Sequence, residues 1–212
     1  MNEPIATHPK AAFSELQLSA LAEAGNIGAG HAAVAMAQLV GRPIMVAVTK
    51  AHVLHVDECH RILGCAKSSE VGLESRVLGD IQGGILVLFE KKSALKLAAV
   101  LLNAPSGEAA AFGEMEQSAL KEACSIVSAS YLNALSDMMS LCIIPSVHRI
   151  IFDRTDALFA RVFGRLRQES TMVIGVETEF LEAFSRITGY FFFMPDKKGV
   201  ATLLERMGVK GK

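Results

Sequence analysis

Net charge is almost absent from this sequence. Lys and Arg number 21 and Asp and Glu 22 among 212 residues, which gives a formal net charge of −1. Nucleic acids and anionic membrane surfaces favour a concentrated basic face, so this composition argues against either partner. No stretch approaches the roughly 20 apolar residues that span a bilayer. The opening "MNEPIATHPKAAF" also lacks the basic and apolar segments of a signal peptide, and we therefore predict a cytoplasmic protein without membrane insertion.

Cysteine is scarce and scattered. The four cysteines form no CxxC pair, and they are Cys59, Cys65, Cys124 and Cys142. Isolated thiols in a cytosolic chain are usually reduced and behave as small hydrophobic side chains. Hydrophobic residues make up 51% of the chain, and a chain of this length buries a sizeable core without disulfide or metal staples. Stability alone therefore requires no cofactor.

The chain contains two similar halves. Residues 13–40 and 112–139 align at an offset of 99 with nine identical positions. The identical pairs are Phe13/Phe112, Glu15/Glu114, Ser19/Ser118, Ala20/Ala119, Leu21/Leu120, Glu23/Glu122, Ala24/Ala123, Ile27/Ile126 and Ala35/Ala134. A second similarity, at an offset of 106, joins the segments that start at Gly83 and Gly189. We therefore predict one domain over residues 1–212, built from repeats at about 13–110 and 112–208.

Each repeat has the pattern of a long helix, several strands and a shorter helix. The first long helix starts at a capping box of Ser14 and Gln17 and ends before Gly41 and Pro43. In the first repeat, strands are expected at 43–49 and twice within 74–90, followed by a helix at Ser93–Leu102. In the second repeat, a helix is expected at Glu114–Met139 and another at Val200–Met207. The strands between them are expected near Ile143–Phe152, Ala157–Phe163, Thr171–Glu177 and Tyr190–Met194. The pattern predicts an α+β fold with pseudo-two-fold symmetry, in which helices cover a largely antiparallel sheet.

The segment "EAGNIGAG" (23–30) places three glycines inside the first long helix. Its order, G-x-x-G-x-G, differs from the G-x-G-x-x-G of a dinucleotide loop, and no strand precedes it. Glycine inside a helix costs about 0.5–1 kcal/mol relative to alanine. We therefore expect that Gly25, Gly28 and Gly30 allow close approach of another helix or of a partner protein.

Three polar residues share one face of this helix. Ser19, Glu23 and Asn26 are spaced so that their side chains project together. Such a stripe is either an ordinary solvated face or a functional site. The second repeat keeps Ser118 and Glu122 and replaces the third member by Ser125, which is compatible with shared function or with shared ancestry alone.

A zinc site is a third candidate. His52, His55, Cys59 and His60, with Asp57 between them, lie close together in the sequence. Their spacing fits no zinc-finger pattern, and a strand through this segment would direct His52 and His55 to opposite faces. The pattern favours no metal site.

The stretches "LSALAEAGNIGAGHAAVAMAQLV", "SALKEACSIVSASYLNALSDMM", "GDIQGGILVL" and "MPDKKGVATLLERMG" together resemble the CheC phosphatases of bacterial and archaeal chemotaxis, relatives of CheX and FliY. The resemblance extends over nearly the whole chain from Phe13. It implies a pseudo-symmetric α+β domain with one long helix in each half, each carrying an active site. The family motif is Asp or Ser, three residues, Glu, two residues, Asn, and a Pro 23 positions after the Asn.

The first repeat matches this motif at Ser19, Glu23 and Asn26, with Thr49 at the proline position. The second repeat matches at Ser118 and Glu122. There, Ser125 replaces the Asn and His148 stands at the proline position. One complete site and one degenerate site are therefore expected.

The resemblance implies the hydrolysis of phosphoaspartate on a CheY-like response regulator that carries its own Mg²⁺, without a cofactor of this chain. In that reading Asn26 orients the attacking water and Glu23 pairs with a lysine of the regulator. Ser125 lacks the amide, so the second site is expected to be weak or inactive while Glu122 still docks a regulator. The alternative is a non-catalytic adaptor that binds a phosphorylated regulator or the receptor deamidase CheD.

Overall fold

The computed structural model describes residues 13–59, 69–104, 111–164, 172–182 and 185–208. Their elements, in chain order, are α1 (Glu15–Val40), β1 (Met45–His55), the 3-10 helix η2 (Val56–Glu58), β2 (Ser69–Gly79), β3 (Gly83–Glu90), α3 (Lys91–Leu101), α4 (Glu114–Met139), β4 (Ile143–Pro145), β5 (Arg149–Arg154), α5 (Thr155–Phe163), β6 (Met172–Glu182), β7 (Ser185–Pro195) and α6 (Lys197–Arg206). The two long helices and most of the predicted strands are confirmed.

One seven-stranded sheet forms the centre of the fold. Its order is β1-β6-β7-β3-β2-β4, and β5 also pairs with β2. All pairings between neighbouring strands are antiparallel, which confirms the predicted α+β class. If β1 is matched with β4 and β5, β2 with β6, and β3 with β7, the order reads the same from either edge. A duplicated chain would produce this order, and the duplication itself stays a prediction.

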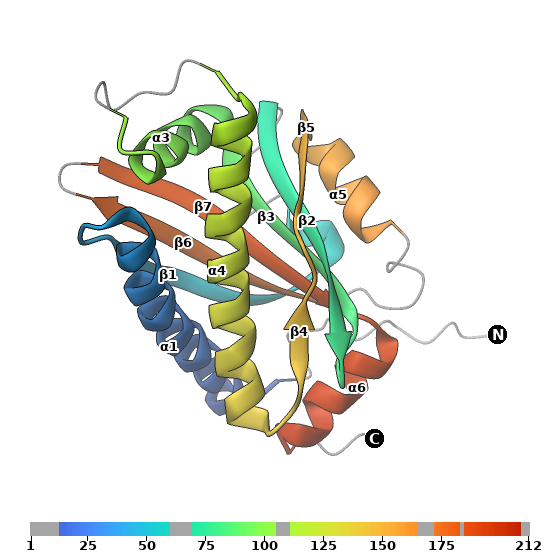
Figure 1. The fold of residues 1–212 in the computed structure, drawn as a ribbon. Helices are drawn as coiled ribbons and strands as arrows, with labels where there is room; N and C mark the ends of the chain where they lie inside the picture. Colours follow the sequence, from blue (N-terminus) through green and yellow to red (C-terminus); the bar gives the residue numbers. More distant parts are fainter. Residues whose placement is uncertain (1–12, 60–68, 105–110, 165–171, 183–184, 209–212) are drawn as a thin grey trace.

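Helices cover both faces of the sheet. α1 and α4 lie side by side across one face, while α5 lies beyond β5 (Figure 1). The alternation of β3 explains this arrangement, because successive side chains of a strand point to opposite faces. Ile85, Val87 and Phe89 pack in the core cluster that contains α1 and α4 residues. Leu86 and Leu88 pack in a second cluster with Leu158 of α5.

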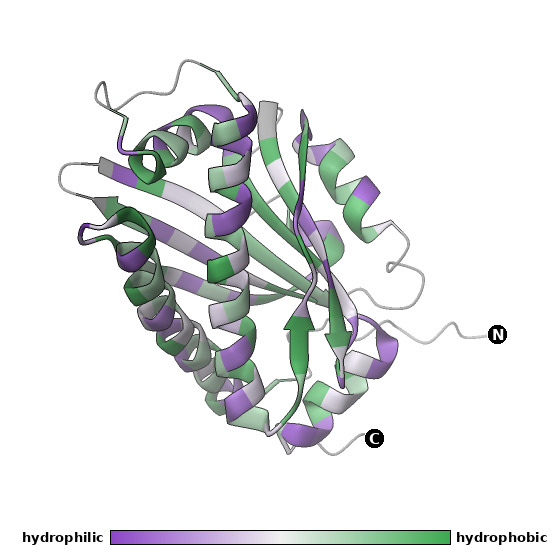
Figure 2. Ribbon diagram, in the orientation of Figure 1, coloured by the Kyte–Doolittle hydropathy of each residue, from purple (hydrophilic) through white to green (hydrophobic). Residues whose placement is uncertain are grey.

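The hydropathy of the elements differs between the sheet and the long helices. Figure 2 shows hydrophobic residues along the central strands and a mixture of hydrophilic and hydrophobic residues along α1 and α4. None of the helices in the described part of the chain combines the length and the apolar character that a bilayer-spanning helix needs.

The segment from Ala157 to Phe163 corrects one prediction. It was expected to be a strand and instead lies in the helix α5. Its aromatic and β-branched residues suit a strand locally, but Leu158 and Phe163 are buried against the sheet only when the segment is helical. Gly72 of β2 makes room for this helix, because a Cβ there would lie 2.9 Å from Leu158 Cδ2.

The predicted strand region between Ile143 and Phe152 is divided. β4 and β5 pair with different parts of β2, and residues 146–148 separate them. Ser146 fills the gap, because its backbone N–H donates to Arg76 O at 2.7 Å while its Oγ accepts from Arg76 N at 2.9 Å. The edge of the sheet is therefore interrupted beside α4.

Candidate functional site

The outer face of α1 carries the predicted site. The helix begins at the predicted capping box, in which Ser14 Oγ accepts from Gln17 N at 3.3 Å, and it ends at Gly41, whose φ of 74° is left-handed. Ser19, Glu23 and Asn26 are all exposed. Neither Glu23 nor Asn26 has a side-chain hydrogen bond or ion pair to any other described residue. Both groups are therefore free to engage a partner.

Gly28 brings α1 against α4. A Cβ at this position would lie 2.6 Å from Tyr131 Cδ1, 2.8 Å from Tyr131 Cα and 2.9 Å from Ser130 O. Two of these three atoms are backbone atoms that a side-chain rotation cannot move. The expectation of close helix packing is therefore confirmed for Gly28.

Tyr131 is held in place on the α4 side of this contact. Its hydroxyl lies 2.8 Å from Thr178 Oγ1, and its ring packs edge-on against Phe191 with centroids 5.2 Å apart. Burial raises the pKa of Tyr131 to about 12, although the hydrogen bond with Thr178 opposes the shift. The phenol is therefore a neutral structural group that fixes the spacing of the two long helices.

The other two glycines of the segment differ from Gly28. A Cβ at Gly25 would make an ordinary contact of 3.7 Å with Val48 Cγ2. A Cβ at Gly30 would meet nothing within 4 Å. Internal packing therefore requires a glycine only at Gly28, and approach of a partner to Gly30 stays a prediction.

Thr49, at the proline position of the motif, lies at a bulge in β1. The pairing with β6 passes from Val48 to Lys50 and leaves Thr49 as the extra residue. Its Oγ1 donates to Glu177 O at 3.3 Å. Proline is tolerated in sheets mainly at edges and bulges, and Thr49 lies at such a bulge.

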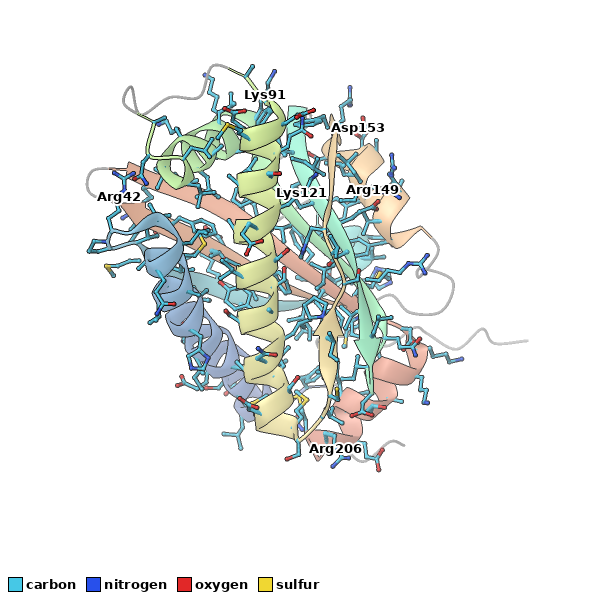
Figure 3. All side chains as sticks on the ribbon, viewed as in Figure 1. Arg42, Lys91, Lys121, Arg149, Asp153 and Arg206 are labelled. Atoms are coloured by element: carbon cyan, nitrogen blue, oxygen red, sulfur yellow. The ribbon has the colours of Figure 1, made fainter. Side chains whose placement is uncertain are left out.

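The corresponding face of α4 is arranged differently. Ser118 and Glu122 are exposed, but Ser125 is half-buried. The hydroxyl of Ser125 donates to the carbonyl of Lys121 at 2.8 Å, and Lys121 is labelled on α4 in Figure 3. The same oxygen lies 3.2 Å from Nδ1 of His148. The third polar position of the second site is therefore turned toward the sheet.

His148 forms a buried cluster with serines of β2 and α4. Its Nε2 lies 3.2 Å from Ser75 Oγ and 3.1 Å from Ser128 Oγ. Because Ser125 already donates its only hydroxyl hydrogen to Lys121, Nδ1 of His148 must donate to Ser125 and Nε2 must accept. The imidazole is 3% exposed, and burial lowers its pKa from 6.5 to about 4. His148 is therefore a neutral residue whose hydrogen bonds join α4 to the sheet.

Sequence reasoning missed this cluster. It identified His148 only as the residue at the proline position, and it gave no role to Ser75 or Ser128. Ser75 and His148 are separated by 73 residues, so no local spacing reveals their contact. A polar residue within the apolar alternation of β2 was the only signal present.

Within the histidine-rich segment, His55 caps η2, because its Nδ1 accepts from Asp57 N at 3.3 Å. Burial, with the nearby charges of Glu58 and Asp57, raises the pKa of Cys59 to about 12, so the thiol is protonated. In the described ranges, no group of three or more His, Cys, Asp or Glu side chains could hold a metal ion. His60 lies outside the described residues, as does Cys65; Cys59, Cys124 and Cys142 are free thiols.

A cavity of about 720 Å³ lies elsewhere, along β2 and the start of β3 and beside α5. Arg76, Arg149 and Arg161 line it, and Arg149 is labelled in Figure 3. The α1 stripe does not contribute to its lining. The candidate site is therefore a helix surface rather than a cleft, which suits a macromolecular substrate better than a small molecule.

Comparisons with known proteins agree with these features. Residues 16–48, which include the α1 stripe, match the CheC-like family. Over 200 residues the chain is 32% identical to the CheY-P phosphatase CheC of Bacillus subtilis (strain 168), a match that covers 92% of this chain and 96% of that protein. Among solved structures, FliY of Thermotoga maritima superposes with a TM-score of 0.72 at 21% identity, covering 94% of this chain and 99% of that one. A chain of the FliM-SpeE complex from H. pylori has a TM-score of 0.68 at 12% identity, covering 92% of this chain and 96% of that one. The two structural matches show a shared fold.

Proposed function

The chain belongs to the CheC-like family, and we propose that it is a phosphatase that hydrolyses the phosphoaspartate of a CheY-like response regulator. The observation that carries this proposal is the pairing of Glu23 and Asn26 on the exposed face of α1, with no partner among the described residues. The spacing of i and i+3 places both groups on one side of the helix, about 4.5 Å apart along its axis.

Asn26 is the proposed catalytic residue. Phosphoryl transfer depends on an in-line nucleophile and on neutralisation of the phosphoryl charge. The regulator supplies the neutralising groups, its bound Mg²⁺ and a lysine, so the phosphatase has only to position a water molecule. The carbonyl oxygen of an amide accepts a hydrogen bond from water, and the NH₂ group donates to a phosphoryl oxygen. The amide thereby orients the nucleophile without itself taking a proton.

Glu23 has a different role in this proposal. Its carboxylate lies one turn before Asn26, at the same exposed surface. An ion pair with the lysine of the regulator would fix the position of α1 over the phosphoaspartate. Ser19, a further turn back and also exposed, borders the same contact. Glu23 therefore acts mainly in docking and Asn26 in the chemical step.

A second candidate function rests on α4. Glu122 and Ser118 are exposed as Glu23 and Ser19 are, but the hydroxyl of Ser125 is held by Lys121 and His148. This face retains docking groups without a group that positions water. It fits an adaptor surface that binds a phosphorylated regulator, or CheD, without turnover.

The test measures the decay of phosphorylated CheY-like regulators with Mg²⁺ present. We expect the wild-type protein to accelerate the decay and Asn26→Ala to remove about a hundredfold of the acceleration, which corresponds to about 2.7 kcal/mol of transition-state stabilisation. Glu23→Ala should weaken binding of the phosphorylated regulator. The matched variants Ser125→Ala and Glu122→Ala on α4 should leave turnover nearly unchanged.

Two outcomes decide between the candidates. Decay at the intrinsic rate with every regulator tested, together with binding of the phosphorylated form, would reject the phosphatase and support the adaptor. Equal losses from Asn26→Ala and Ser125→Ala would reject the assignment of the chemistry to α1.

A further inference from the structure

Gly30 has no structural reason to be glycine. It is exposed, its backbone is helical, and a Cβ built on it meets nothing within 4 Å. Alanine would be the better helix former at such a position. Gly28, two residues earlier, is explained by Tyr131. The internal packing of the chain therefore accounts for one glycine of the pair and leaves the other unexplained.

Gly30 lies in line with the proposed site. A separation of seven residues falls only roughly 20° short of two helical turns, so Glu23 and Gly30 share one face of α1. Val34, one turn further along, continues this line and is 62% exposed. Ile27, beside it, is 47% exposed. Two exposed aliphatic side chains thus flank a glycine immediately beyond the polar stripe.

The α4 face lacks this arrangement. At an offset of 99 residues, Gly30 corresponds to Ala129 and Val34 corresponds to Asn133. Ile126, the counterpart of Ile27, is half-buried rather than exposed. The apolar ridge with a glycine at its centre is present only on the helix that carries the complete polar stripe.

We propose that Ile27, Gly30 and Val34 form the recognition ridge for the response regulator. The receiver domain of the regulator closes on this ridge with an apolar surface next to its phosphorylation site, and Gly30 admits close approach of that surface where a side chain would obstruct it. This inference rests on the proposed phosphatase function, because the occupant is the regulator that Glu23 and Asn26 act on. The ridge continues the same helix face by two turns, so one rigid surface carries both recognition and chemistry.

The experiment uses Gly30→Ala and Gly30→Gln. Gly30 is exposed and a Cβ there meets nothing within 4 Å in the free protein, so both variants should fold, and Gly30→Ala should raise the melting temperature by about 1–4 °C. Both should raise KM for the phosphorylated regulator, Gly30→Gln by about tenfold, while kcat at saturating regulator stays within about twofold. A higher KM with unchanged kcat indicates lost binding rather than lost chemistry.

Two further variants serve as controls. Val34→Asn places the residue of α4 on α1 and should raise KM without lowering the melting temperature. Ala129→Gly, the reciprocal change at the matched position of α4, should lower the melting temperature and leave KM unchanged.

The outcomes separate this inference from the proposed function. An active wild-type protein whose KM is unaffected by Gly30→Gln would overturn the ridge and leave the phosphatase intact. If Gly30→Gln changed the oligomeric state on size-exclusion chromatography and left KM unchanged, the ridge would be a contact with a second copy of the chain. That result would also overturn the proposal. A wild-type protein without phosphatase activity would overturn the proposed function first.

Discussion

The outer faces of α1 and α4 have the same backbone and different chemistry. Both helices span 26 residues, and they keep Ser and Glu at matching exposed positions. The difference is the third polar position. Asn26 faces solvent without a partner among the described residues, whereas Ser125 bonds inward to Lys121 and His148. The two matching faces therefore differ in whether the third polar side chain has an internal partner, while the helix itself is alike in both.

The edge strands beside the two helices show the same contrast. Thr49 is an extra, exposed residue at the bulge in β1. His148 occupies the corresponding place beside α4, at the interruption between β4 and β5, and its imidazole is buried among three serines. The bulge at Thr49 thus leaves the outer face of α1 free. The interruption at His148 places an imidazole beneath the outer face of α4.

The largest expected effect is a loss of stability in acid that depends on His148. The pKa of the imidazole is lowered from 6.5 to about 4 in the folded protein, so the unfolded chain takes up the proton first as the pH falls. The contribution is absent above about pH 6.5 and grows to about 3 kcal/mol of destabilisation near pH 4. Urea unfolding at pH 7, 6, 5 and 4 measures it.

His148→Gln is the matched variant for this measurement. Glutamine keeps a donor and an acceptor but does not titrate, so the difference in stability between wild type and variant should change with pH. Parallel losses of stability in the two proteins between pH 6.5 and 4 would contradict the assigned protonation of His148.

An intermediate effect is expected at the contact between the two helices. Gly28→Ala forces a Cβ against the backbone of Tyr131 and Ser130 and should reduce the free energy of unfolding by about 2 kcal/mol. Gly25→Ala is the control, because its Cβ makes only an ordinary contact with Val48 and improves helix propensity. Thermal denaturation of both variants tests the distinction, which fails if Gly28→Ala is as stable as Gly25→Ala.

The smallest expected effect is a partial transfer of activity to α4. In an Asn26→Ala background, Ser125→Asn alone should remain inactive, because the buried imidazole still occupies the space beneath the site. Ser125→Asn with His148→Pro should gain about tenfold in dephosphorylation rate, or about 1.4 kcal/mol. Equal activity of the single and double variants would show that His148 has no part in suppressing the second site.

Sequence patterns predicted the long helices well because their signals are local. The capping box at Ser14, the left-handed Gly41 and the extent of α4 from Glu114 to Met139 all agree with the structure. The strand predicted at Ala157–Phe163 failed for a tertiary reason. The residues of that segment give no information about Gly72 of β2, which leaves room for a helix to place Leu158 against the sheet.

The candidate site was predictable only in part for the same reason. Spacing along a helix was enough to place Ser19, Glu23 and Asn26 on one exposed face. It could not show that Ser125 turns inward, because the partner that holds it, His148, comes from the sheet edge. The spacing also could not show that Gly28 is required for helix packing whereas Gly30 has open space around it.

The serine-histidine cluster makes the α4 face costly to change one residue at a time. Replacing Ser125 alone deprives a buried imidazole N–H of its acceptor, and replacing His148 alone removes the shared partner of three serines. Either single change costs about 1–3 kcal/mol, the usual penalty of an unsatisfied buried polar group. Replacing Ser125 and His148 one after the other therefore passes through a less stable intermediate, which opposes conversion of the α4 face into a copy of the α1 face.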